Sequence, residues 1–91
     1  MTQHTTNTID ITAAILQPPF YQPGADAAAN YCATGAVIGH EITHGFDSLG
    51  RQYDPQGNLR NWWTPAADGQ FKRRTDVLVD QYSHYEILPG L

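Results

Sequence analysis

This chain of 91 residues contains little cysteine and few charged residues, and both shortages exclude some classes of protein. Its single cysteine, Cys32, excludes an internal disulfide and a cysteine-cluster metal site, and we expect it to be a small buried hydrophobic residue. Charged residues make up only 15% of the chain, against about 25% in an average globular domain. The net charge of −4 argues against a nucleic-acid partner, which requires clusters of basic residues.

Long apolar runs are also missing. No stretch of about eighteen apolar residues is present, so the sequence predicts no membrane-spanning segment in this chain. The first ten residues have neither the basic start nor the apolar centre of a signal peptide, so we expect any export signal to lie outside these residues. The length allows one domain at most, near the lower limit for burying a useful core.

Local patterns predict a mainly α chain with a short β element. β-branched residues alternate at Ile9 and Ile11, which predicts a strand over residues 8–14. A lone strand is unstable, so we expect its partner strands to come from another copy or from parts of the domain outside these residues. The proline-rich segment that follows, QPPFYQPGAD, predicts a loop.

Two long helices are predicted. The first spans about residues 27–44, with Asp26 as its N-cap and Gly45 as a left-handed residue at its end. The second spans about residues 65–85, with Thr64 as its N-cap and Pro65 at the first helical position. One stripe of the second helix is apolar and is predicted to face a core; it consists of Phe71, Leu78, Tyr82 and Tyr85.

Residues 36–47, AVIGHEITHGFD, carry the pattern with the most chemistry. On a helix, His40 and His44 share one face about 6 Å apart along the axis. That spacing lets both imidazoles bind one Zn²⁺ at about 2.0–2.1 Å. Glu41 is turned about 100° from His40, so it can face the open coordination position without being a ligand. In this H-E-x-x-H pattern, zinc lowers the pKa of a bound water, the glutamate accepts its proton, and the hydroxide attacks a peptide carbonyl.

The alternative is a core helix that happens to carry histidines, since the pattern fixes only three positions. Val37, Ile38 and Ile42 predict a largely buried helix, in which two unliganded histidines would need hydrogen-bond partners. Zinc would supply a partner for both.

Four other residues invite a functional interpretation. We interpret the paired tryptophans, Trp62 and Trp63, as packing anchors rather than as the lining of a binding pocket. His84 is interpreted as a surface histidine, and His4 is placed in a frayed terminus.

Residues 54–57, with the sequence DPQG, predict a turn between the two helices.

The wider sequence resembles the neprilysin and endothelin-converting-enzyme family of zinc metallopeptidases. The resemblance reaches from about Asn7 to Gly90, and three segments carry it: AAILQPPFY, NYCATGAVIGHEITHGFDSLGRQYDPQGNLRNWWTP and QYSHYE. It implies a partial thermolysin-like (zincin) catalytic domain over residues 1–91, a zinc cofactor and peptide substrates cleaved on the amino side of apolar residues. It also implies a secreted, periplasmic or membrane-anchored ectodomain location.

By the same resemblance, His40 and His44 are zinc ligands and Glu41 is the catalytic base. The family's third ligand is a glutamate in a downstream G-E-N-[I/L]-A-D segment, which these 91 residues do not contain. Asp47 shares a face with His44, and we expect it to support that histidine or to anchor the loop.

Two functional hypotheses remain open. One is a zinc metalloendopeptidase segment that is inactive as the isolated chain. The other is a non-catalytic, truncated peptidase module that packs against a partner or against itself.

Overall fold

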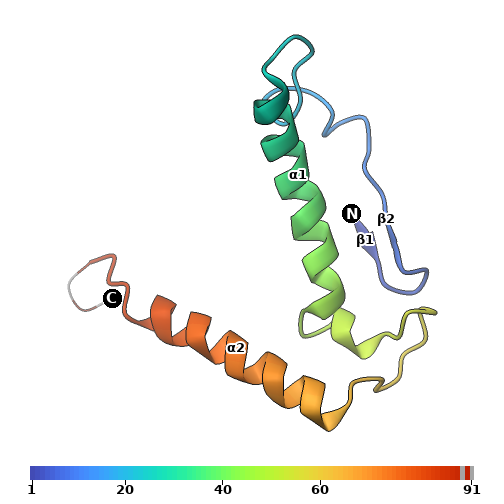
Figure 1. Cartoon of the computed structure of the whole chain (residues 1–91), viewed down its shortest axis with the longest axis vertical. Coiled ribbons are helices and arrows are strands. Elements are labelled where there is room, and N and C mark those ends of the chain that lie inside the picture. Colours follow the sequence, from blue (N-terminus) through green and yellow to red (C-terminus); the bar gives the residue numbers. More distant parts are fainter. Residues whose placement is uncertain (89, 91) are drawn as a thin grey trace.

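The computed structural model describes residues 1–88 and 90 of the chain. It confirms a mainly helical fold with a short β element. Figure 1 shows helices α1 and α2 as the two arms of an L, with the hairpin of β1 and β2 running beside α1. The elements, in chain order, are β1 (Thr2–Gln3), β2 (Thr8–Ile9), α1 (Ala27–Thr43), the 3₁₀ turns η1 (His44–Phe46) and η2 (Gly50–Gln52), and α2 (Pro65–Ser83).

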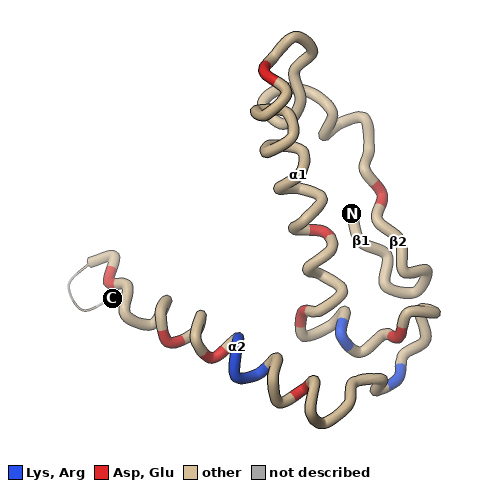
Figure 2. Tube along the Cα trace, in the orientation of Figure 1, with Lys and Arg blue, Asp and Glu red and all other residues tan. Residues whose placement is uncertain are grey.

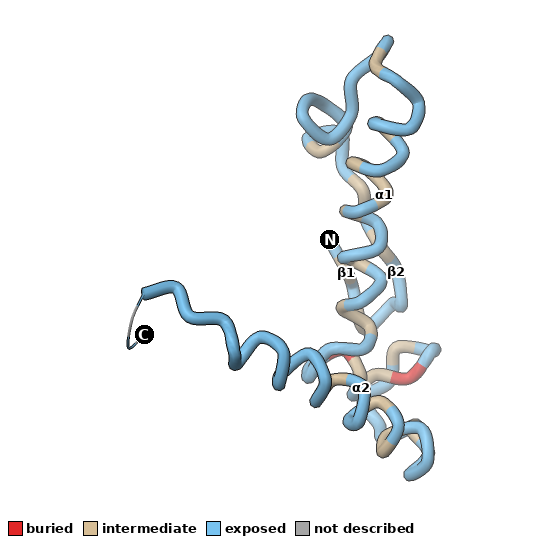
Figure 3. Tube along the Cα trace, turned by 60° about the vertical axis from the view of Figure 1, so that its left-hand side comes forward, coloured by how far each residue is buried: buried red, intermediate tan, exposed pale blue. Residues whose placement is uncertain are grey.

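The described part of the chain has no buried hydrophobic residue, because the two helices diverge instead of packing together. The radius of gyration is 17.3 Å, against about 12 Å for a compact domain of this length. The buried residues are Gly50 and Asp54, which lie at the corner of the L (Figure 3). The tightest packing is therefore at this corner, next to the H-E-x-x-H motif.

Several predictions of burial are wrong for this reason. The first helix is not largely buried, since Ile38 is 40% exposed and Ile42 is 52% exposed. Cys32 is exposed rather than buried. The stripe on α2 does not face a core, because Leu78 and Tyr82 are more than half exposed. The apolar periodicity is real, but no other described element of the chain covers these side chains.

The predicted strand is shorter than expected, and its partner lies within the chain. β2 ends at Ile9 and runs antiparallel to β1, with Thr2 opposite Ile9 and Gln3 opposite Thr8. Residues 10–12 have no regular structure and turns begin at residue 13, so the strand does not continue to residue 14. The expectation that another copy or another part of the domain pairs with β2 is wrong for this edge, because the first residues of the chain occupy it.

The helix starts follow the predicted caps. The Asp26 carboxylate accepts a hydrogen bond from the Ala28 amide at 2.7 Å, and the Thr64 hydroxyl accepts one from the Ala67 amide at 3.1 Å. The end of α1 differs from the prediction, because Gly45 is not left-handed. The chain instead tightens into η1, where the His44 amide donates to the carbonyl oxygens of Glu41 and Ile42.

A buried carboxylate organises the turn at the corner. Asp54 accepts hydrogen bonds of 2.9 Å from the amides of Gln56 and Asn58, and it forms an ion pair with Arg60. The Gly57 amide donates to the Asp54 carbonyl at 2.8 Å, which confirms the predicted turn. Figure 2 shows that Lys and Arg lie at the corner and on α2, and that α1 has none.

Aromatic contacts attach the start of α2 to the corner. The ring of Trp63 packs edge-on against Phe46 and Phe71, at centroid distances of 6.2 and 5.2 Å. The Arg51 guanidinium lies 4.5 Å from the centroid of the Trp63 ring and pairs with Asp68. Trp63 is therefore a packing anchor, as predicted. The same prediction is wrong for Trp62, which is 38% exposed and lines a pocket beside the hairpin.

The two remaining histidines lie on different parts of the fold. His84 is a surface residue, as predicted, with 73% of its side chain exposed. His4 is not in a frayed terminus, because it stacks on Tyr53 at a centroid distance of 5.5 Å. None of the described helices is both long and apolar enough to span a bilayer.

Candidate metal centre

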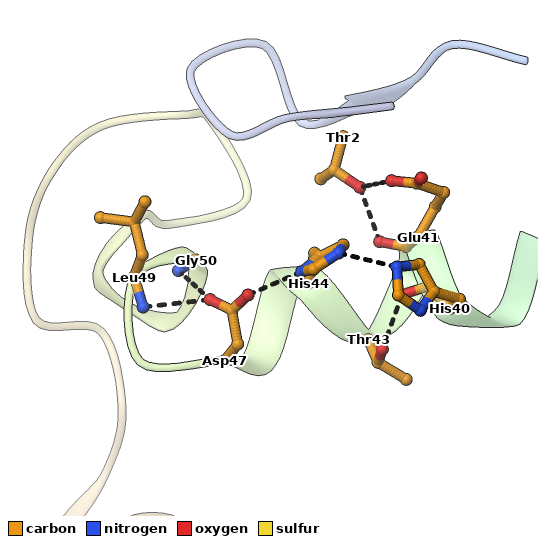
Figure 4. A network of polar contacts seen from close by, with 8 residues as sticks. All are labelled: Thr2, His40, Glu41, Thr43, His44, Asp47, Leu49 and Gly50. Carbon is orange, nitrogen blue, oxygen red and sulfur yellow. Dashed lines mark hydrogen bonds and ion pairs between the residues drawn. The ribbon is translucent and has the colours of Figure 1, made fainter.

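The end of α1 brings His40 and His44 together. Their Nε2 atoms lie 3.0 Å apart, and the two rings are nearly perpendicular with centroids 4.7 Å apart (Figure 4). His40 lies in the last turn of α1 and His44 opens η1, so the four-residue spacing survives the change of helix type. The two nitrogens that a metal ion would use therefore face each other.

This geometry fits a single zinc ion. Two nitrogens bound tetrahedrally to one zinc ion at about 2.0–2.1 Å lie about 3.3 Å apart. The observed separation of 3.0 Å needs only a small rotation of the rings to reach that value. The His44 side chain is 41% exposed, so an ion can reach it from solvent.

Asp47 fixes the orientation of His44. One carboxylate oxygen lies 2.7 Å from His44 Nδ1, and the other accepts hydrogen bonds from the amides of Gly50 at 2.7 Å and Leu49 at 3.0 Å. The Gly50 amide, followed by the His44 side chain, lowers the pKa of Asp47 to about 2. An ionised carboxylate only accepts, so Nδ1 of His44 is the donor, and in the neutral imidazole this leaves the lone pair on Nε2 for a metal.

Glu41 lies against the hairpin. Its carboxylate accepts a hydrogen bond of 2.6 Å from the Thr2 hydroxyl, and only 16% of its side chain is exposed. The Thr2 hydroxyl is also 2.8 Å from the Glu41 carbonyl oxygen. The hydrogen bond from Thr2, helped by the nearby N-terminal amine, lowers the pKa of Glu41 and keeps it ionised. Figure 4 shows the carboxylate turned toward Thr2 on β1.

Thr2 is a residue that sequence reasoning missed. It lies 39 positions from Glu41 in a polar segment that we interpreted as frayed. A threonine in such a segment gives no local signal, so only the hairpin pairing could have revealed this contact.

His40 and His44 are two candidate ligands, and a third is not found in the part of the chain that the structure describes. Over residues 1–88 and 90, no group of three His, Cys, Asp or Glu side chains is arranged to hold a metal ion. Asp47 lies behind His44 rather than beside the pair, because its carboxylate contacts Nδ1 and not Nε2. The structure thus brings three side chains into sequence: Asp47 contacts His44, and His44 contacts His40.

A pocket of about 330 Å³ lies between the hairpin and the corner. Glu41 and the neighbouring Ile42 line it, and His40 and His44 do not. Its other lining residues include Thr2, His4, Phe46, Tyr53 and Trp62.

The sequence comparisons identify related peptidases. The family model of peptidase family M13 matches residues 2–90. Neprilysin-11 of Caenorhabditis elegans is 52% identical over 81 residues, which are 89% of this chain and 10% of that protein. Human endothelin-converting enzyme 1 is 48% identical over 83 residues, which are 91% of this chain and 11% of that protein. The chain thus spans about a tenth of the length of these relatives.

Solved structures show the same arrangement. The zinc metalloprotease Zmp1 of Mycobacterium tuberculosis, in complex with an inhibitor, superimposes with a TM-score of 0.82 at 53% identity, covering 93% of this chain and 13% of that chain. PepO of Lactobacillus rhamnosis superimposes with a TM-score of 0.72 at 49% identity, covering 79% of this chain and 11% of that chain. The open L is therefore the path that this stretch takes inside much longer chains. On these grounds, the chain belongs to peptidase family M13.

Proposed function

We propose that this chain carries two zinc ligands and the catalytic base of a zinc metalloendopeptidase. The observation that supports this most directly is the pair of Nε2 atoms 3.0 Å apart, with the Nδ1 atom of His44 held by Asp47. A buried histidine in a core would place its nitrogens on polar groups of the fold. Here the two Nε2 atoms lie 3.0 Å apart at an exposed position, close to the separation at which both can bind one metal ion.

Each residue has a separate role in the proposal. His40 and His44 bind zinc through Nε2, and Asp47 keeps His44 in the tautomer that leaves this atom free. A zinc ion held by these two residues would supply a Lewis acid for the peptide carbonyl and would lower the pKa of a water molecule. Glu41, kept ionised by Thr2, accepts the proton of the attacking water and then delivers it to the leaving nitrogen.

The substrate we propose is a peptide, in keeping with the family. We further propose that the isolated 91-residue chain has little activity, because the described residues offer two ligands and the chemistry requires a fixed metal. A non-catalytic module is the second candidate function. The exposed apolar residues of α2 favour it, since a face of this kind suits packing against protein.

Zinc titration of the chain by calorimetry tests the site assignment. We expect weak binding of one ion per chain, abolished in the double variant His40→Ala, His44→Ala. His84→Ala is the matched control, because His84 is exposed on the other arm and should leave the zinc affinity unchanged. Zinc binding by the double variant as strong as that of the wild type would refute the assignment.

A further inference from the structure

Gly50 is one of the two buried residues of the described chain, and it lies directly behind the metal centre. Its amide donates the 2.7 Å hydrogen bond to Asp47, whose other oxygen holds His44. A Cβ atom at this position would lie 1.8 Å from the carbonyl oxygen of His44, a distance that no real side chain can adopt. Any residue larger than glycine must therefore push the backbone of His44 away from η2.

The hairpin also lies close to Gly50. The same Cβ atom would lie 2.8 Å from Cε1 of His4, whose ring stacks on Tyr53. The His44 carbonyl and the His4 ring thus both occupy the space that a side chain at position 50 would need. Thr2 of the same hairpin donates a hydrogen bond to Glu41. The hairpin therefore contacts both Glu41 and the glycine that supports Asp47 and His44.

We propose that Gly50 is a positioning residue for the metal site, and that His4 holds it in place. Because Gly50 lacks a side chain, η1 and η2 can approach closely enough for its amide to fix the Asp47 carboxylate. Asp47 in turn fixes the ring and the tautomer of His44. This inference rests on the proposed function, because the property that it explains is zinc affinity.

The test compares Gly50→Ala with Gly45→Ala by zinc calorimetry. Gly45 lies in η1 next to His44, and a Cβ atom added there meets nothing within 4 Å, so it adds the same methyl group without the clash. We expect Gly50→Ala to lower the zinc affinity about tenfold to hundredfold, the usual cost of losing support for a metal ligand. Gly45→Ala should match the wild type.

A second readout needs no metal. Imidazole ¹⁵N shifts, recorded above the pH range in which histidine titrates, should show His44 protonated on Nδ1 in the wild type. In Gly50→Ala the shifts should move toward those of a free imidazole. A wild type without zinc binding would refute the proposed function, and the shifts would still test the link from Gly50 to His44. If the wild type binds zinc and both variants match it in affinity and shifts, the inference alone is refuted.

Circular dichroism accompanies both measurements, because the clash in Gly50→Ala can also disturb folding. If the helical signal of Gly50→Ala falls below that of the wild type, the variant His4→Ala tests the proposal instead. It removes the imidazole ring next to Gly50 without adding an atom. We expect the same directions of change with a smaller drop in affinity. Unchanged zinc affinity and unchanged His44 shifts in His4→Ala would overturn the proposal.

Discussion

The Thr2 hydroxyl donates a 2.6 Å hydrogen bond to the carboxylate of Glu41, 39 residues further along the chain. This contact joins the first strand to the residue that we propose as the catalytic base. It favours the ionised form of Glu41, so it sets how that carboxylate titrates.

Thr2→Val should raise the pKa of Glu41 toward its ordinary value, because valine keeps the branched shape and removes the donor. The lowered pKa means that this bond stabilises the fold above the ordinary carboxyl pKa, and that the stabilisation is lost as the pH falls through the lowered value. NMR titration of the Glu41 carboxyl carbon measures the shift. Thr6→Val is the control, since Thr6 bonds only within the hairpin, and an unchanged pKa in Thr2→Val would contradict the prediction.

Asp47→Asn should weaken zinc binding about tenfold to hundredfold. The asparagine amide can donate to Nδ1 of His44, which moves the imidazole proton to Nε2, the atom that zinc requires. Calorimetric titration gives the affinity, with the exposed Asp76→Asn as a control for the lost charge. Equal affinities in the two variants would show that Asp47 anchors the loop only.

The isolated chain should show little or no cleavage of a quenched fluorescent peptide with zinc present. Positioning of metal, water and substrate supplies most of the rate, and the described residues provide an incomplete ligand set. Zinc-dependent cleavage that disappears in Glu41→Gln would contradict this expectation and would reveal a third ligand.

The isolated chain should also self-associate, through helix packing rather than through the strand. Val77 and Val79 are each 66% exposed and Leu78 is 56% exposed, and the net charge of −4 provides little repulsion. Sedimentation velocity over a concentration series should show a growing dimer, reduced in Val77→Glu, Val79→Glu. A compact monomer at every concentration would count against this prediction.

The sequence by itself determined the local features of this protein. Asp26 and Thr64 mark the helix starts, because a cap bonds to amides only two or three residues away. The spacing of His40 and His44 likewise places both on one helical face. The match to the family also lies in the sequence, since it follows residue by residue over positions 2–90.

Only the tertiary structure decided which of these residues are supported and which are exposed. The contact of Thr2 with Glu41 and the closeness of His4 to Gly50 join segments that are distant along the chain, where no periodic pattern exists. The exposure of Ile42 and Leu78 could not be predicted from the sequence either. An apolar stripe shows which face of a helix can pack against protein, and not whether another element covers it. Burial depends on what packs against a surface, and here the two helices diverge.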